Sequence, residues 1–198
     1  MIINNLEKQI QFKIVYYGPA MSGKTTTLRA LFRHFGKEHQ IQSIESTVNR
    51  TLFFDYGTII FQNKNWDVKL NIYTTTGQDF YCVTRPTIIQ ATDGIIFVVD
   101  SQQIARERNL ISWGELNKFF TKETMFSIPK IIAFNKQDKL EKFKIQPFLK
   151  ELKYENYQNI EIMKTIAING EGVLQSFERI IGMIIENAYQ KETLIESS

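Results

Sequence analysis

The chain has 198 residues, of which 43% are hydrophobic and 23% charged, and its formal net charge is +3. This composition is typical of a globular domain with one core, and it excludes a disordered or fibrous protein. The small net charge, without a concentrated basic face, argues against a nucleic-acid-binding protein. The lysines between 136 and 153 alternate with acidic residues and are interpreted as a solvated helix face.

The sequence carries no legible signal for a membrane or for secretion. Cys82 is the only cysteine, which leaves no internal disulfide and favours a reducing compartment. The ends match neither a myristoylation signal nor a prenylation box. No apolar run approaches the roughly 18 residues that span a bilayer. We therefore expect a cytoplasmic protein without a lipid anchor.

Hydrophobic periodicity predicts strands and helices in alternation along the chain. Strands are expected over 10–17, 51–62, 66–73, 94–100, 128–134 and 160–167. Helices are expected over 24–35, 104–121, 145–153 and 172–189, whereas 43–50 and 75–85 are irregular, with a helical turn possible in the second half of the latter.

This alternation predicts an α/β fold with a doubly wound, mostly parallel sheet. We expect six strands, one of them an antiparallel hairpin strand joined through the turn at 63–65, and about five helices. A single domain is expected over 1–198, with its core over 10–190 and a polar tail over 191–198. Ligands of such sheets bind at the carboxyl ends of the strands.

The first strand runs directly into Gly18-Pro19-Ala20-Met21-Ser22-Gly23-Lys24-Thr25, which matches the phosphate-binding pattern G-x-x-x-x-G-K-S/T. The glycines permit a tight turn, so that backbone N–H groups and the positive end of the following helix converge on the phosphates. The lysine reaches the terminal phosphates, and the threonine hydroxyl ligates Mg²⁺. The expected nucleotide-binding residues of this loop are Gly18, Ala20, Met21, Ser22, Gly23, Lys24, Thr25 and Thr26. The loop alone does not distinguish ATP from GTP.

A second motif, Asn135-Lys136-Gln137-Asp138, follows another apolar strand. The carboxylate of Asp138 can accept hydrogen bonds from both adjacent donors of guanine, whereas adenine would leave it unpaired. We expect Asn135 to brace the loop and contact the base edge, and the stem of Lys136 to lie over the base. The pair of motifs predicts binding of GTP and GDP.

Together these residues resemble the Ras-like small GTPase family over nearly the whole chain. The chain is most similar to the MglA-like branch of bacteria and archaea, whose members act in cell polarity and gliding motility. The stretches that carry this finer match are Asn49-Arg50-Thr51-Leu52-Phe53-Phe54-Asp55, Tyr73-Thr74-Thr75-Thr76-Gly77-Gln78 and Phe97-Val98-Val99-Asp100-Ser101. A fourth stretch, 167–173, resembles the last nucleotide loop, in which the N–H of Ala167 would contact the guanine oxygen. Ile166 stands where the family has a serine.

The resemblance implies roles for four residues near the γ-phosphate. Thr51 would ligate Mg²⁺ together with Thr25, and Gly77 would donate its N–H to the γ-phosphate. Gln78 would orient the attacking water. We hypothesise that Arg50 is an arginine finger supplied by the same chain; the alternative is an arginine that faces solvent or a partner. Gln78, Arg50 and Lys24 are thus the expected catalytic residues.

One position departs from the usual family pattern. Small GTPases generally have aspartate at the position of Thr74, where it anchors Mg²⁺ through water, although the MglA-like branch resembles this chain in having threonine. Asp55 is a candidate replacement; it can also be interpreted as an exposed strand residue. Asp100, which closes its strand, is interpreted as structural. Ala20 replaces a common glycine and suggests slow intrinsic hydrolysis.

We therefore expect a GTP/GDP switch that hydrolyses GTP slowly unless it is stimulated. The resemblance implies a Roadblock-type GTPase-activating homodimer as a partner, together with unidentified effectors. Two alternatives stay open: a GTP-dependent binding or scaffold module with little hydrolysis, which Thr74 and Ala20 favour, and a trafficking GTPase of the Arf or Rab kind, against which the missing lipid motifs count.

Overall fold

The computed structural model describes residues 1–44, 54–75 and 85–196. Its strands are β1 Ile2–Asn4, β2 Gln9–Tyr17, β3 Gln42–Ile44, β4 Phe54–Phe61, β5 Asp67–Thr74, β6 Gly94–Asp100, β7 Lys130–Asn135 and β8 Ile160–Lys164. Its α-helices are α1 Lys24–His34, α2 Arg85–Ile89, α3 Arg106–Lys118, α4 Lys122–Ser127, α5 Ile145–Glu151 and α6 Val173–Glu196.

The strands form one sheet with the order β3-β4-β5-β2-β6-β7-β8, and β1 pairs with the first residues of β2. The five strands from β5 to β8 in this order are parallel, whereas β4 is antiparallel to β5. The predicted α/β fold with a mostly parallel sheet and an antiparallel hairpin strand is confirmed. Within the described ranges the sheet has eight strands, because β1 and β3 were not predicted; three residues are too few to show periodicity.

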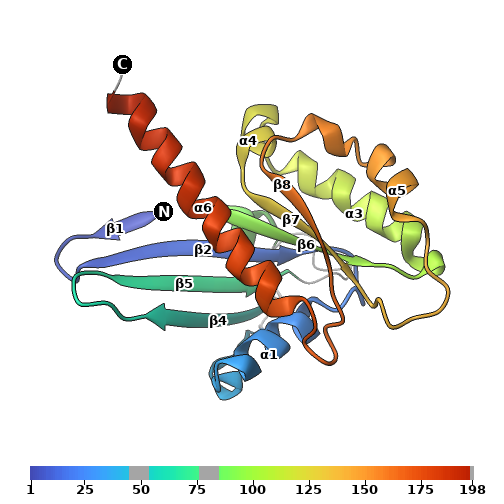
Figure 1. Cartoon of the computed structure of the whole chain (residues 1–198), viewed down its shortest axis with the longest axis horizontal. Helices are drawn as coiled ribbons and strands as arrows, with labels where there is room; N and C mark the ends of the chain where they lie inside the picture. Colours follow the sequence, from blue (N-terminus) through green and yellow to red (C-terminus); the bar gives the residue numbers. More distant parts are fainter. Residues whose placement is uncertain (45–53, 76–84, 197–198) are drawn as a thin grey trace, which may run out of the picture.

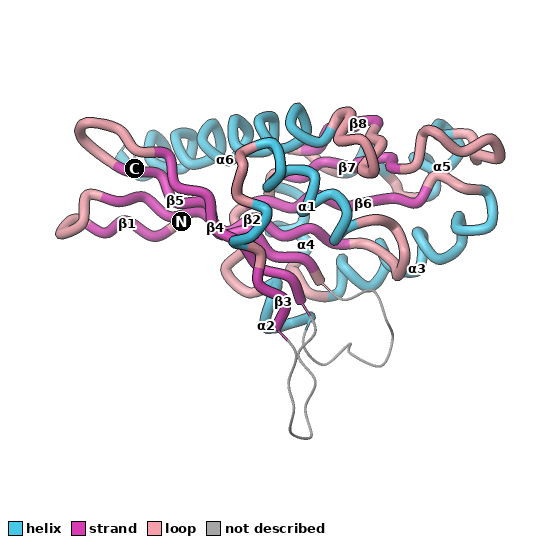
Figure 2. The backbone as a smooth tube through the Cα atoms, turned by 90° about the horizontal axis from the view of Figure 1, so that it is seen from below, coloured by secondary structure: helices cyan, strands magenta, loops and turns pink. Residues whose placement is uncertain are grey.

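Helices cover both faces of the sheet, as Figures 1 and 2 show. On one face α1 and α6 pack against the sheet through side chains such as Leu28, Phe32 and Phe177. On the other face α3 and α5 do so through Trp113 and Phe148. All residues of β6 and β7 are buried, which explains why their sequences are continuous apolar runs.

Two helices differ from the predicted ranges. The helix expected over 104–121 ends at Lys118, and a separate short helix α4 follows. Thr121 starts α4 because its hydroxyl oxygen accepts the N–H of Thr124 at 3.2 Å. The last helix continues to Glu196 rather than ending near 189, in keeping with the absence of glycine and proline from that stretch.

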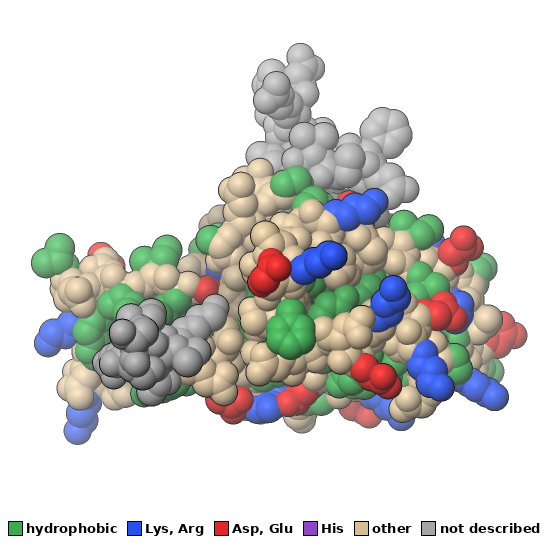
Figure 3. Space-filling view, turned by 90° about the horizontal axis from the view of Figure 1, so that it is seen from above, with side chains coloured by type: hydrophobic (Ala, Val, Ile, Leu, Met, Phe, Trp, Pro, Cys, Tyr) green, Lys and Arg blue, Asp and Glu red, His purple; other side chains and the backbone are tan. Residues whose placement is uncertain are grey.

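The described surface carries mixed charges. On the face shown in Figure 3, basic and acidic side chains are interspersed. Among the helices in the described ranges, none has both the length and the apolar character to cross a membrane.

The parallel strands bring the predicted motifs to one edge of the sheet. The phosphate loop follows β2, Thr75 follows β5, and Asp100 ends β6. Asn135 ends β7, and Ala167 comes shortly after β8. Since the carboxyl ends of parallel strands lie at the same edge, residues more than 100 positions apart in the chain share one site.

Candidate nucleotide-binding site

The phosphate loop is a tight turn between β2 and α1, and two of its positions require glycine. Gly18 has φ 141° and Gly23 has φ 102°, both in the region that side chains disfavour. A Cβ atom on Gly18 would lie 2.4 Å from the carbonyl oxygen of Val98, and one on Gly23 would lie 2.3 Å from Nδ2 of Asn135. The loop therefore packs directly on β6 and on the base-reading motif.

Lys24 is the first residue of α1 and is buried. Its Nζ donates hydrogen bonds to the carbonyl oxygens of Gly18 at 2.8 Å and Pro19 at 2.7 Å. The ammonium group thus lies across the phosphate loop, next to the amino end of α1. A buried cation beside a helix N-terminus favours an anion at this position.

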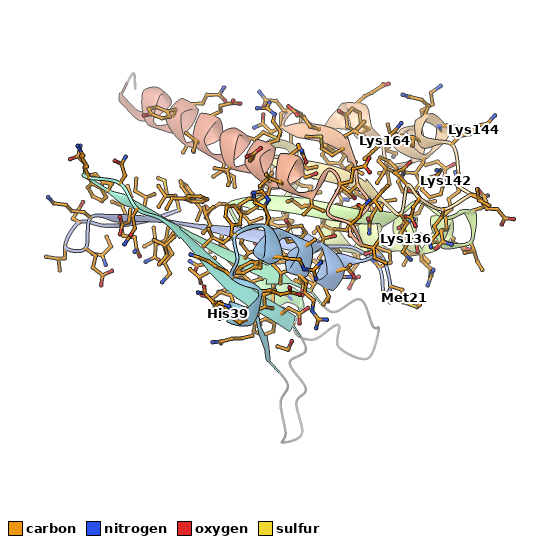
Figure 4. The ribbon with its side chains drawn as sticks, turned by 60° about the horizontal axis from the view of Figure 1, so that its bottom comes forward. Met21, His39, Lys136, Lys142, Lys144 and Lys164 are labelled. Atoms are coloured by element: carbon orange, nitrogen blue, oxygen red, sulfur yellow. The ribbon has the colours of Figure 1, made fainter. Side chains whose placement is uncertain are left out.

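The other residues of the loop lie around this cation. The side chain of Ser22 is buried, whereas Thr25 and Thr26 face the surface and Ala20 is half-buried. Met21 is 78% exposed, with φ 62°. Figure 4 places Met21 and Lys136 at the same end of the sheet, so the phosphate loop and the base-reading motif border one surface.

Asn135 joins three segments of this edge through its buried side chain. Its Nδ2 donates to the carbonyl oxygen of Ser22 at 2.8 Å. Its Oδ1 accepts the N–H of Ala167 at 2.9 Å and the hydroxyl of Thr165 at 3.2 Å. The phosphate loop, the N-K-x-D motif and the loop after β8 are therefore held together by one amide. Because Ala167 already donates to Asn135, a guanine oxygen would share this donor with it.

The two charged residues of the motif have different surroundings. Lys136 has φ 63°, and its Nζ donates to Oδ2 of Asp100 at 2.8 Å. Asp138 lies at the surface, where its carboxylate is 3.3 Å from Nζ of Lys139. An accessible carboxylate at the end of the motif is able to accept two donors of a base.

A cluster of hydroxyl groups surrounds the carboxylate of Asp55 beside α1. Thr25 Oγ1 donates to Asp55 Oδ2 at 2.6 Å, and Thr74 Oγ1 donates to the same oxygen at 3.2 Å. Ser43 Oγ donates to Oδ1 at 2.8 Å. The backbone N–H of Asp55 in turn donates to Thr74 Oγ1 at 3.0 Å. Asp55 thus lies next to the expected metal ligand Thr25, and Thr74 supports it.

Four predicted site residues lie outside the described residues. These are Arg50, Thr51, Gly77 and Gln78. Their roles remain the predictions made from the sequence.

Two residues that contact the site were missed in the sequence. Thr165 and Ser43 lie outside the motifs that we singled out. Asp100, interpreted from the sequence as structural, accepts a hydrogen bond from Lys136 of the base-reading motif. For Ser43, the only signal in the sequence is its place as the first residue of the irregular stretch 43–50. For Asp100, the signal was its position at the carboxyl end of a buried strand, where ligand-binding residues gather.

Comparison with known proteins identifies the family to which the chain belongs. Residues 1–184 match the model of the ADP-ribosylation factor family. The chain is 30% identical over 188 residues to the mutual gliding-motility protein MglA of Myxococcus xanthus, covering 92% of this chain and 95% of that protein. It is 28% identical to ADP-ribosylation factor-like protein 4A of Homo sapiens, over 93% of this chain and 89% of that protein. It is 27% identical to ADP-ribosylation factor-like protein 3 of Saccharomyces cerevisiae, over 94% of this chain and 92% of that protein.

These matches confirm the family inferred from the motifs, including its MglA-like character. Members of this family bind guanine nucleotide and hydrolyse GTP, and the two motifs that such activity needs lie together at one edge of the sheet. The chain therefore belongs to the ADP-ribosylation factor family and is a small GTPase that acts as a GTP/GDP switch.

Proposed function

We propose that this GTPase is a magnesium-dependent switch in which Asp55, on β4, takes the metal-anchoring place that Thr74 does not fill. The observation that carries the proposal is the pair of hydrogen bonds from Thr25 and Thr74 to one oxygen of Asp55. The carboxylate that small GTPases generally have on one strand would thus be supplied by the neighbouring strand.

The donor atoms fit magnesium. Thr25 and Asp55 offer only oxygen atoms, which are the ligands that Mg²⁺ prefers. The described part of the chain has no group of three or more His, Cys, Asp or Glu side chains placed to hold a metal. Magnesium does not need one, because it is commonly held by one or two protein groups, water and substrate phosphates. Thr25 would bind the metal directly, and Asp55 would hold its water ligands.

The remaining residues would bind the nucleotide and position it for hydrolysis. Magnesium, when bound, neutralises charge on the β- and γ-phosphates, and Lys24 adds a second positive charge there. Asn135, Lys136 and Asp138 would hold the base. We propose that Gln78 orients the attacking water and that Arg50 stabilises the charge that develops on the γ-phosphate.

The setting that we propose is cell polarity or motility. It is supported by the printed name of the Myxococcus relative, a gliding-motility protein that matches 92% of this chain. A Roadblock-type homodimer would stimulate hydrolysis, and effectors would bind the GTP form. The single cysteine supports a cytoplasmic location. A GTP-dependent binding module with little hydrolysis is the second candidate, favoured by Ala20 in the phosphate loop.

The test measures dissociation of fluorescent GDP as a function of Mg²⁺ concentration. Wild type is compared with Asp55→Asn and with Asp67→Asn, a control at the other end of the sheet. We expect Mg²⁺ to slow dissociation from wild type and the control, and at least tenfold more Mg²⁺ to be needed for Asp55→Asn. If Asp55→Asn responds to Mg²⁺ as wild type does, Asp55 is not the anchoring residue. Parallel GTP hydrolysis of wild type, with and without the homodimer, separates a switch from a binding module.

A further inference from the structure

Asp100 is a buried carboxylate at the end of β6 whose charge is balanced by a residue of the base-reading motif. Its side chain is 2% exposed, and its Oδ2 accepts a hydrogen bond from Nζ of Lys136 at 2.8 Å. Its other oxygen accepts the N–H of Gln102 at 3.1 Å. A buried charge of this kind is stable only when it is paired and hydrogen-bonded, so the contact to Lys136 is a strong restraint.

The position of this carboxylate is fixed by α3. The buried side chain of Asn109 donates from Nδ2 to the carbonyl oxygen of Asp100 at 2.8 Å. Its Oδ1 accepts the N–H of Asp100 at 3.0 Å. Both backbone groups of Asp100 are therefore held by one amide, and the carboxylate is presented to Lys136 from a rigid base.

The loops around the two residues are also tied together. The N–H of Ser101 donates to the carbonyl oxygen of Asn135 at 3.2 Å, and Gln137 Nε2 donates to Ser101 Oγ at 2.7 Å. The segment after β6 thus runs alongside the base-reading loop. Lys136 crosses from one to the other, with 24% of its side chain exposed.

We propose that Asp100 is a positioning residue for guanine binding, because it holds the ammonium of Lys136 so that the methylene stem of this lysine forms a fixed wall of the base pocket. The inference rests on the proposed placement of the base at Asn135, Lys136 and Asp138. A free lysine side chain rotates about four bonds and must be ordered when the base binds. Fixing both ends of the stem removes that entropic cost before the nucleotide arrives.

The variant Asp100→Asn distinguishes the proposed positioning role of Asp100 from a purely structural role. Asparagine has the same shape, and its single oxygen still accepts the N–H of Gln102. Its amide group, however, presents N–H to the lysine ammonium, and two donors repel each other. The variant therefore keeps the local fold and leaves the ammonium of Lys136 only its longer hydrogen bond to Oε1 of Gln102, at 3.4 Å.

The experiment measures the dissociation rate of GDP labelled on its ribose from the full chain with Mg²⁺, for wild type, Asp100→Asn, Lys136→Ala and the double variant. Glu161→Gln is the matched control, because it removes an ion-paired carboxylate on β8, where Glu161 accepts from Arg179 at 2.8 Å. We expect roughly tenfold faster dissociation from Asp100→Asn, as for loss of one charge-assisted hydrogen bond. Glu161→Gln should match wild type.

The double variant decides whether Asp100 acts through Lys136. If it does, the double variant releases GDP no faster than Lys136→Ala alone. Additive effects of the two substitutions, or an unchanged rate for Asp100→Asn, would overturn the proposal. Thermal unfolding without nucleotide should show similar stability for Asp100→Asn and wild type. A wild type that holds GDP no better than ADP would refute guanine binding itself, which is a separate outcome.

Discussion

The hydroxyl of Thr25 and the carboxylate of Asp55 lie 2.6 Å apart although they belong to α1 and β4. The pairing of β4 with β5 explains why Asp55 reaches this place. Tyr56 pairs with Tyr73 in the antiparallel ladder, so that Asp55 lies beside Thr74 at the end of β5. The acidic group and the hydroxyl group are thus neighbours on adjacent strands, and exchanging them is a direct test of the proposed metal anchor.

We expect Thr74→Asp alone to lower the stability of the folded protein. It would place a second carboxylate beside Asp55, and two like charges in one site destabilise the folded state by on the order of 1–2 kcal/mol. In the double variant Asp55→Thr/Thr74→Asp one carboxylate remains, and Mg²⁺-dependent retention of GDP should recover toward the wild-type level. Urea unfolding and GDP dissociation with and without Mg²⁺ measure the two effects. Equal Mg²⁺ dependence for Asp55→Thr alone and wild type would contradict the assignment.

Gly23→Ala should weaken the link between the phosphate loop and Asn135. Its φ is 102°, and the new Cβ would lie 2.3 Å from Nδ2 of Asn135, so that the bond from this amide to Ser22 must shift. We expect a loss of about 1–3 kcal/mol of folding free energy and faster GDP release.

Gly36→Ala is the control for Gly23→Ala. Gly36 also has a positive φ, 65°, but a Cβ there would meet no atom within 4 Å. Denaturant unfolding of both variants should show the larger loss for Gly23→Ala. Similar losses for the two would mean that backbone strain, and not the contact with Asn135, determines the effect.

The local motifs made the phosphate and base loops predictable, because each consists of adjacent residues whose chemistry depends on short spacing. That the two loops lie at the same edge of the sheet could also be predicted, because the strands before them are parallel. The sequence did not reveal that Asn135 contacts the main chain of Ser22, 113 positions away, since such a contact depends on how the loops pack. Asp55 was one of the sequence candidates for the metal anchor, but its contact with Thr25 was not predicted, because the register of β4 against β5 decides which side chain of the hairpin reaches this place.

We expect Arg50→Ala and Gln78→Ala to slow hydrolysis with little effect on nucleotide binding. An arginine finger contributes on the order of 10³–10⁵ in rate, and most of this factor should be lost in Arg50→Ala. Arg50→Lys keeps the charge but loses the planar fork, and should recover only a small part of the rate. Single-turnover GTP hydrolysis with the Roadblock-type partner is the measurement. If the partner accelerates GTP hydrolysis by Arg50→Ala as much as it does by wild type, Arg50 is not an arginine finger.

Lys130 predicts an unusual dependence of stability on pH. Its side chain is fully buried at the start of β7, and its Nζ has no hydrogen-bond partner among the described residues. Nζ lies over the ring of Tyr157, 5.0 Å from its centroid. Burial without an acceptor lowers the pKa of Lys130 from 10.5 to about 7. The ring offsets only part of the cost of burying the ammonium.

The sign of the effect follows from proton binding. Between pH 7 and 10 the unfolded chain holds a proton on Lys130 that the folded chain has released, so the free energy of unfolding rises with pH by about 1.4 kcal/mol per unit. Below pH 7 both states are protonated, and the folded state carries the full burial cost. Lys130→Met should therefore unfold at a higher urea concentration than wild type at pH 7, with a free energy of unfolding larger by roughly 1–3 kcal/mol. Its free energy of unfolding should also not rise between pH 7 and 10 as that of wild type does. Lys118→Met, on the surface of α3, is the control, and a wild-type slope in Lys130→Met would assign the pH dependence to another group.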